Sequence, residues 1–208
     1  MSQVLFVKAN NRPADQSATV KLYESFLQTY KETHPADVVT ELNLFEVNLP
    51  YYDLDMLNGL FKVGKGMPTT PEEQQAAEVA NAYLEQFLQA DKVVFAFPLW
   101  NFTIPAQLLT YLFYLNQAGK TFKYTEQGPV GLVGDKKVAL LQARGGVYSE
   151  GPMTALEMSL NYVKNTLAFW GINHPEAVVV EGHNQFPDRA EEIIQDGVKR
   201  AAELAAKF

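Results

Sequence analysis

Short apolar runs alternate with amphipathic stretches along the whole chain. Most of the runs show no polar alternation, which is typical of strands buried on both faces of a parallel sheet. The amphipathic stretches repeat apolar residues at intervals of three and four, which predicts helices. Strands that alternate with helices indicate an α/β fold, a doubly wound five-stranded parallel sheet with helices on both faces, in a single domain spanning residues 1–208. The expected strands are residues 4–7, 38–44, 93–97, 138–142 and 177–181.

Helix boundaries are marked by capping residues. Ser17 is placed to cap a helix with apolar positions from Val20 to Tyr30, and Thr70 followed by Pro71 opens a helix that continues to about Gln89. Three further helices are expected at about residues 105–117, 153–170 and 187–207.

Two connections are longer than a simple turn. Residues 121–132 predict a small hairpin or excursion from the sheet, with Tyr-Thr-Glu-Gln-Gly-Pro as its turn. Residues 53–70 fit a short helix from Asp53 to Phe61 followed by a glycine-containing loop, and serve either as a lid over a crevice or as an ordinary connector.

The helix expected from Pro105 to Gln117 is apolar on several sides. One face of a sheet cannot cover such a helix, so the pattern predicts contact with a partner subunit.

The loop after the central strand carries the first candidate chemistry. The run that ends at Phe97 leads through Pro98 and Leu99 into Trp100-Asn101-Phe102. Loops at the carboxyl ends of parallel strands line the ligand crevice of an open α/β sheet. The two rings can pack against a flat heteroaromatic ligand while the amide meets its polar edge. The alternative is that both rings are packing residues.

The loop from Ala9 to Thr19 lies between the first strand and the first helix, where free N–H groups and the helix dipole attract an anion. Ser17 and Thr19 can add hydroxyl donors to a phosphate site, or can simply open the helix. Neither the Gly-x-Gly-x-x-Gly fingerprint nor the phosphate loop of nucleotide triphosphatases occurs, which leaves a bound mononucleotide open.

A third loop follows the fourth strand. Gly145 and Gly146 let the backbone approach a ligand without obstruction by a Cβ, or form a flexible turn. Arg144 precedes them and either attracts an anionic partner at a pocket mouth or forms a solvent-facing ion pair.

Composition narrows the possible functions. With 47% hydrophobic and 20% charged residues, the chain has globular composition. It contains no cysteine, which excludes thiolate catalysis and cysteine-ligated metals, and the three histidines lack ligand spacing, so we expect no metal. A formal charge of −7 argues against general nucleic-acid binding. No apolar stretch has the length of a membrane span and the amino terminus does not resemble a signal peptide, so we expect a cytoplasmic protein.

Nearly the whole chain resembles the FMN-dependent NAD(P)H azoreductases of the flavodoxin-like quinone reductase superfamily. The resemblance rests on long matches in the expected order: Pro-Leu-Trp-Asn-Phe at 98–102, the segment from Ala118 to Leu132, Arg-Gly-Gly-Val-Tyr at 144–148, and Val-Glu-Gly-His at 180–183.

This resemblance implies a set of site residues. Asn10 and residues 17–19 would hold the FMN phosphate, residues 99–102 would line one side of the isoalloxazine, and residues 143–146 would contact its polar rim. Trp100, Phe102 and Tyr124 would also contact substrate. The implied cofactor-binding residues are Asn10, Ser17, Ala18, Thr19, Pro98, Leu99, Trp100, Asn101, Phe102, Ala143, Arg144, Gly145, Gly146 and Tyr148.

The resemblance also implies the activity and assembly. NADH or NADPH would donate a hydride to bound FMN, and a quinone or azo compound would then receive two electrons at the same place, in a ping-pong scheme. The flavin carries the chemistry, so no catalytic side chain is expected. The family forms homodimers with sites at the interface. Two alternatives remain: an electron carrier like a flavodoxin, which the additional segments at 53–70 and 121–132 disfavour, and a flavin-free interaction protein.

Overall fold

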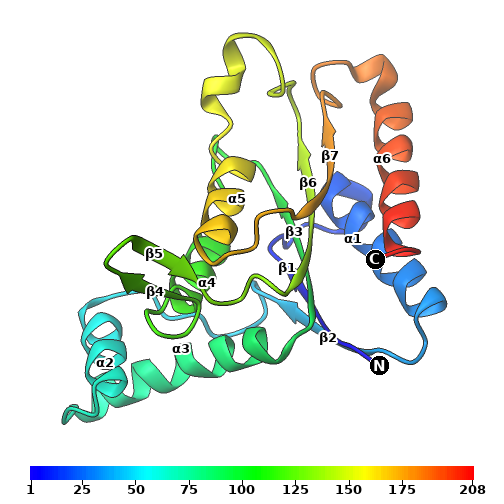
Figure 1. The fold of residues 1–208 in the computed structure, drawn as a ribbon. Coiled ribbons are helices and arrows are strands. Elements are labelled where there is room, and N and C mark those ends of the chain that lie inside the picture. Colours follow the sequence, from blue (N-terminus) through cyan, green and yellow to red (C-terminus); the bar gives the residue numbers. More distant parts are fainter.

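A five-stranded parallel sheet forms the centre of the molecule (Figure 1). The computed structural model describes residues 1–208. The strand order β2-β1-β3-β6-β7 corresponds to 2-1-3-4-5 along the chain, the flavodoxin-like doubly wound order. The predicted α/β class, strand number and parallel direction are therefore confirmed. The strands are β1 (Gln3–Lys8), β2 (Val38–Asn43), β3 (Lys92–Pro98), β6 (Lys137–Arg144) and β7 (Glu176–Glu181).

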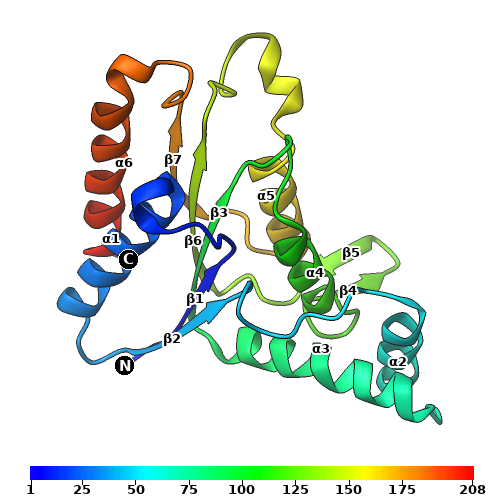
Figure 2. The same cartoon turned by 180° about the vertical axis from the view of Figure 1, so that it is seen from behind.

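Helices cover both faces of this sheet (Figures 1 and 2). Helices α1 (Ala18–Thr33) and α6 (Ala190–Ala205) lie on one face. Helices α3 (Pro71–Gln89), α4 (Ala106–Leu115) and α5 (Leu160–Phe169) lie on the other. The remaining elements are α2 (Leu54–Gly64), which packs on α3, the antiparallel hairpin β4 (Phe122–Thr125) and β5 (Gly128–Gly131), and short 3₁₀ turns at Ala14–Gln16, Gly151–Leu156 and Pro187–Arg189.

The capping residues act as the sequence predicts. The Ser17 hydroxyl accepts the Val20 N–H at the start of α1. Thr70 and Glu73 form a reciprocal capping box at the start of α3. Each interaction satisfies amide groups that the first helical turn leaves without a backbone partner.

Apolar side chains fill both spaces between the sheet and its helices. On the α1–α6 face, Phe6 packs edge-to-face against Phe26 and Tyr30. On the opposite face, the buried Trp170 packs edge-to-face against Phe87. Because both faces of β3 are covered, every residue from Val93 to Pro98 is buried. This burial explains the unbroken apolar run.

The helix predicted for residues 153–170 is wrong in its first third. Residues 151–156 form a 3₁₀ turn, and α5 begins only at Leu160. The carboxylate of Glu157 accepts the N–H groups of Leu160 and Asn161, so it caps α5 at a point where the pattern indicated a continuous helix.

Helix α4 is covered mainly by its own chain, and the predicted contact with a partner subunit stays a prediction. Tyr111 and Tyr114 are buried, and both pack against Tyr83 of α3. The Tyr114 hydroxyl also donates to the carbonyl oxygen of Pro50. Phe113 is the only large apolar side chain of α4 that is exposed, so α4 by itself does not require a partner subunit.

The two longer connections both contain regular structure. Residues 121–132 form the predicted hairpin. The helix within residues 53–70 is also confirmed, although it extends to Gly64, and Asp53 caps it through the Met56 N–H. None of the helices combines the length and the apolar character that crossing a lipid bilayer requires.

Candidate functional site

A cleft of about 430 Å³ opens at the carboxyl ends of β1, β3 and β6. An adjoining open hollow of about 450 Å³ shares Leu99, Gly145 and Asn184 with it. This is the sheet edge where a doubly wound fold binds ligands, next to the switch point between β1 and β3. All the cofactor-binding residues that the sequence resemblance implies line one of these two spaces.

One end of the cleft is rich in hydrogen-bond donors. Asn10, Ser17 and Thr19 are buried there, and the Asn10 amide donates to the Ser17 hydroxyl oxygen over 3.0 Å. The backbone N–H groups of Ala18 and Thr19 have no acceptor in the chain, and neither does the Thr19 hydroxyl. Free donors at a helix start, where the dipole is positive, form a suitable binding site for an anion.

The Trp100-Asn101-Phe102-Thr103 segment forms a tight left-handed turn. Trp100 and Thr103 exchange two backbone hydrogen bonds, of 2.9 and 3.0 Å. Between them Asn101 and Phe102 have φ angles of 47° and 70°, a conformation that is rare for a bulky residue such as phenylalanine. No residue type or spacing in the sequence indicates this backbone strain, and strained residues of this kind cluster at functional sites.

The turn places unpaired backbone N–H groups next to an aromatic side chain. The N–H groups of Asn101 and Phe102 make no hydrogen bond within the chain. The Trp100 ring is half-buried and contacts Phe45 edge-to-face. The turn therefore brings free N–H donors and aromatic surface together, and the prediction that they contact a ligand stays a prediction.

The paired glycines complete the wall on the β6 side. The N–H groups of Gly145 and Gly146 also lack an acceptor in the chain. A Cβ on Gly145 would lie 2.4 Å from Nδ2 of Asn184, so only glycine fits beneath that side chain. The lack of a Cβ at Gly145 thus makes room for Asn184 of the same chain, so this part of the loop is packed rather than loose.

The environment of the Arg144 side chain matches neither interpretation of the sequence. Its side chain is only 5% exposed and is paired with two carboxylates, Glu181 at 2.8 Å and Glu157 at 3.5 Å. It lines the cleft, but it is neither a free charge at the mouth nor a solvent-facing ion pair. The sequence could not show this, because its partners come from elements that follow much later in the chain.

Several cleft residues were not identified from the sequence. Burial lowers the pKa of His183, and its Nδ1 is buried without a hydrogen-bond partner, so the neutral ring is favoured. From the sequence, His183 could either approach a ligand or be a surface or packing histidine, and the structure places it in the cleft wall. The only sequence signal was its position directly after a strand. The other residues missed are Arg12, Asp15, Gln16, Lys21, Asn184, Ala190 and Ile194.

Tyr124 stands apart from the other candidates. It is 74% exposed on the β4–β5 hairpin, and it lines neither the cleft nor the adjoining hollow. Figures 1 and 2 show the hairpin close to the carboxyl end of α5, far from the sheet edge that bears the cleft. Within one chain, the structure does not bring Tyr124 together with Trp100 and Phe102.

Comparisons with known proteins agree with this geometry. A family model described as a flavodoxin-like fold matches residues 2–205. The chain is 65% identical, over the full length of both proteins, to a Listeria monocytogenes protein named FMN-dependent NADH:quinone oxidoreductase 1. It is 63% identical to a crystallised azoreductase from Bacillus anthracis, with a TM-score of 0.98 and complete coverage of both chains. A second Bacillus anthracis structure, an FMN-dependent NADH-azoreductase in complex with FMN, is 30% identical with a TM-score of 0.89, covering 100% of this chain and 99% of the other.

Proposed function

The chain belongs to the flavodoxin-like fold family, and from this premise we propose that it is an FMN-dependent NADH:quinone oxidoreductase that also cleaves aromatic azo compounds. The observation that carries the proposal is the cleft at the carboxyl edge of the sheet, where a donor-rich helix start and a half-buried tryptophan lie together. FMN combines a phosphate with a flat heteroaromatic ring, and these two features of the cleft match those two chemistries.

The residues present fit FMN at each part of the cleft. Ser17, Ala18 and Thr19 would hold the phosphate with backbone and hydroxyl donors, and Arg12 and Lys21 add positive charge nearby. Pro98, Leu99 and Trp100 would pack against the ring system. The free N–H groups of Gly145 and Gly146 would meet the polar rim of the ring.

Bound FMN supplies acceptance of a hydride and delivery of two electrons to an acceptor. The chain's contribution is binding, orientation and electrostatics. The free N–H groups of Asn101, Phe102, Gly145 and Gly146 are fixed donors, and they would favour negative charge on the cofactor without any proton transfer by the protein. No side chain of the cleft is required as a general base.

The adjoining hollow is the proposed place for both substrates. Asn101, Phe102, Gly146 and Tyr148 line this open space. NADH and the acceptor would occupy it in turn, which implies ping-pong kinetics. Initial rates at several fixed quinone concentrations should then give parallel double-reciprocal lines, and intersecting lines would exclude a shared place.

A homodimer with sites at its interface is part of the proposal. Tyr124 is a large apolar side chain exposed away from its own cleft, so any contact that it makes with flavin or substrate must be in the site of a second copy. A groove of about 260 Å³ between α4 and α5, which includes the exposed Phe113, offers further apolar surface. Sedimentation that gives a flavin-loaded, active monomer at micromolar concentration would disprove the dimer.

The flavin spectrum is the first test. Purified protein supplemented with FMN should show bound flavin, and it should oxidise NADH with a quinone or an azo dye as acceptor. Riboflavin, which lacks the phosphate, should bind much more weakly. A protein that binds no FMN, or binds FMN and transfers no electrons from NADH, would overturn the proposal. NADPH in place of NADH measures the donor preference, and cell fractionation checks the expected cytoplasmic location.

A further inference from the structure

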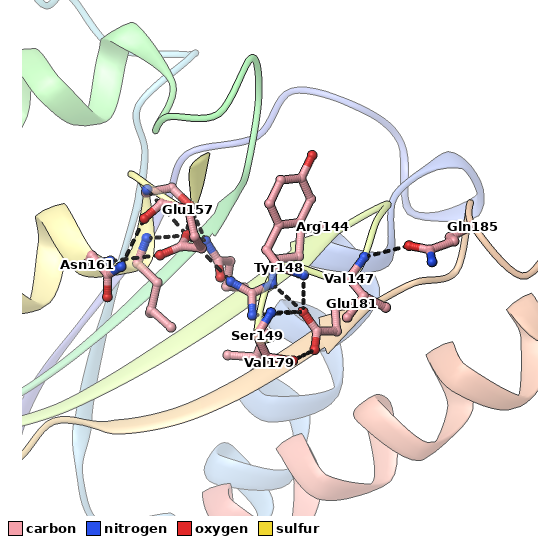
Figure 3. Close-up of polar contacts among 12 residues, drawn as sticks. Arg144, Val147, Tyr148, Ser149, Glu157, Asn161, Val179, Glu181 and Gln185 are labelled. Atoms are coloured by element: carbon pink, nitrogen blue, oxygen red, sulfur yellow. Dashed lines mark hydrogen bonds and ion pairs between the residues drawn. The ribbon is translucent and has the colours of Figure 1, made fainter. Parts of the chain in front are cut away.

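A largely buried ionic cluster lies beside residues 147–149, which follow Gly145 and Gly146 of the cleft wall (Figure 3). The Arg144 guanidinium lies between the carboxylates of Glu157 and Glu181. Glu157 belongs to the amino-terminal cap of α5, whereas Glu181 ends β7. The cluster therefore ties three segments together at the end of β6, where the polypeptide turns into the cleft.

Glu181 is attached to the loop as well as to the arginine. One of its oxygens accepts Arg144 Nε over 2.9 Å, the Tyr148 N–H over 2.9 Å and the Ser149 N–H over 3.2 Å. Its other oxygen accepts the Ser149 hydroxyl. Burial alone would raise the pKa of Glu181, but the hydrogen bonds from Ser149, Tyr148 and Arg144 hold it below the usual value. The carboxylate is therefore charged at neutral pH.

The opposite side of the same loop faces the cleft. Gly145 and Gly146 present their free N–H groups there, and the Gly145 carbonyl accepts the N–H groups of Asn184 and Gln185. A displacement of residues 147–149 would move these donors, because only two peptide units separate Gly146 from Tyr148. Glu181 itself lines neither the cleft nor the adjoining hollow.

The cluster also sets the charge of the cleft wall. One guanidinium and two carboxylates sum to −1. Replacing Glu181 by glutamine would bring that sum to 0. A unit charge acting over about 12 Å in a medium of effective dielectric about 20 changes an equilibrium roughly tenfold.

We propose that Glu181 is a positioning residue of the cofactor site: it holds the Gly145–Ser149 loop against the cleft and offsets the charge of Arg144, and so sets the affinity and the reduction potential of bound FMN. The inference rests on the proposed function, because it presumes that FMN occupies the cleft.

Two variants separate the two parts of this role. Glu181→Gln keeps the shape and removes the charge, so the two-electron midpoint potential of bound FMN should rise by about 30 mV, which corresponds to a tenfold shift toward the reduced form. Glu181→Asp keeps the charge but is shorter by about 1.5 Å. It cannot reach both Arg144 and the loop, so FMN should bind about tenfold more weakly, with a potential close to that of the unsubstituted protein.

Glu176→Gln is the matched control. Glu176 lies on the same strand, at its opposite end, and pairs with Lys137 at 3.9 Å, so its loss also removes one ion pair of β7. This variant should leave both the potential and the FMN affinity unchanged. Dye-coupled potentiometry and quenching of flavin fluorescence measure the two quantities, and thermal unfolding of the flavin-free proteins reports any purely structural effect.

The outcomes distinguish this inference from the proposed function. If the unsubstituted protein binds no FMN, the proposed function fails first. If it binds FMN, a potential in Glu181→Gln that matches Glu176→Gln overturns the charge role. Unchanged FMN affinity in Glu181→Asp overturns the positioning role, and this measurement alone decides if Glu181→Gln does not fold.

Discussion

The left-handed backbone at Phe102 predicts a reversed order of stability between alanine and glycine variants. Phe102 has a φ of 70°, and its carbonyl accepts the Met158 N–H over 3.0 Å, which fixes the turn. A residue with a Cβ loses about 1–2 kcal/mol in this conformation, and glycine does not. Glycine loses about 0.5–1 kcal/mol through its greater freedom in the unfolded chain. The difference favours Phe102→Gly over Phe102→Ala by roughly 0.75 kcal/mol, the midpoint of a range of about 0–1.5 kcal/mol.

The comparison isolates the backbone because both variants lose the same ring. Lys199 provides the matched control, since it is an exposed residue in the interior of α6. There the order should be the usual one, with Lys199→Gly about 0.5–1 kcal/mol less stable than Lys199→Ala. Urea unfolding of the flavin-free proteins gives the four free energies of unfolding.

Activity supplies the second readout at Phe102. Both variants lack the ring that borders the hollow, so both should reduce quinones more slowly, and to a similar extent, despite their different stabilities. A Phe102→Ala protein at least as stable as Phe102→Gly would refute the assignment of strain to this turn. Full activity in both variants would show that the Phe102 ring is not part of the substrate site.

Three further predictions address the phosphate end, the glycine wall and the acid response. Changing Ser17 and Thr19 together to alanine should remove charge-assisted hydrogen bonds worth roughly 1.5–3 kcal/mol each before compensation, and unchanged FMN affinity in a fluorescence titration would contradict their role. Gly145→Ala should lower the free energy of unfolding by roughly 1–3 kcal/mol because its Cβ would meet Asn184, and Asn184→Ala in the same chain should restore most of the loss in urea titrations. Hydrogen bonds from a backbone amide and a tyrosine hydroxyl lower the pKa of Asp37 to about 2. Its stabilising contribution is therefore present above the unfolded value of about 3.9 and lost as the pH falls toward 2, so Asp37→Asn should unfold with a weaker dependence on pH in that window.

The sequence predicted those strands and helices whose apolar pattern and capping residues match the tertiary environment in which they lie. The apolar run at residues 93–97 became the buried central strand, and the capping box at Thr70 marked the start of α3. The break before α5 could not be predicted in this way. Glu157 caps that helix from a cluster whose other members are distant in the chain, so the local apolar spacing gave no sign of it.

In the candidate site too, features set by neighbouring residues were predictable, whereas features set by distant residues were not. Residue types at strand ends were enough to place the cleft, because the parallel topology brings those ends to one edge. The ion pairing of Arg144 in the cleft wall could not be predicted from the sequence. A lone arginine before two glycines suggested either an anion attractor or a solvent-facing ion pair, but Arg144 is paired inside the protein with Glu181 and Glu157 from two other elements.

The cleft exposes backbone donors by three different local devices, and this explains why no glycine fingerprint appears in the sequence. At α1 the donors are free because a helix start has no preceding turn, although Ser17 satisfies one of them. At Asn101 and Phe102 a left-handed turn points the amides outward at an energetic cost, and at Gly145 the absence of a Cβ leaves room for Asn184. Only the third device needs glycine. A search for glycine spacing therefore detects one wall of the cleft, whereas the topology of the sheet identifies all three.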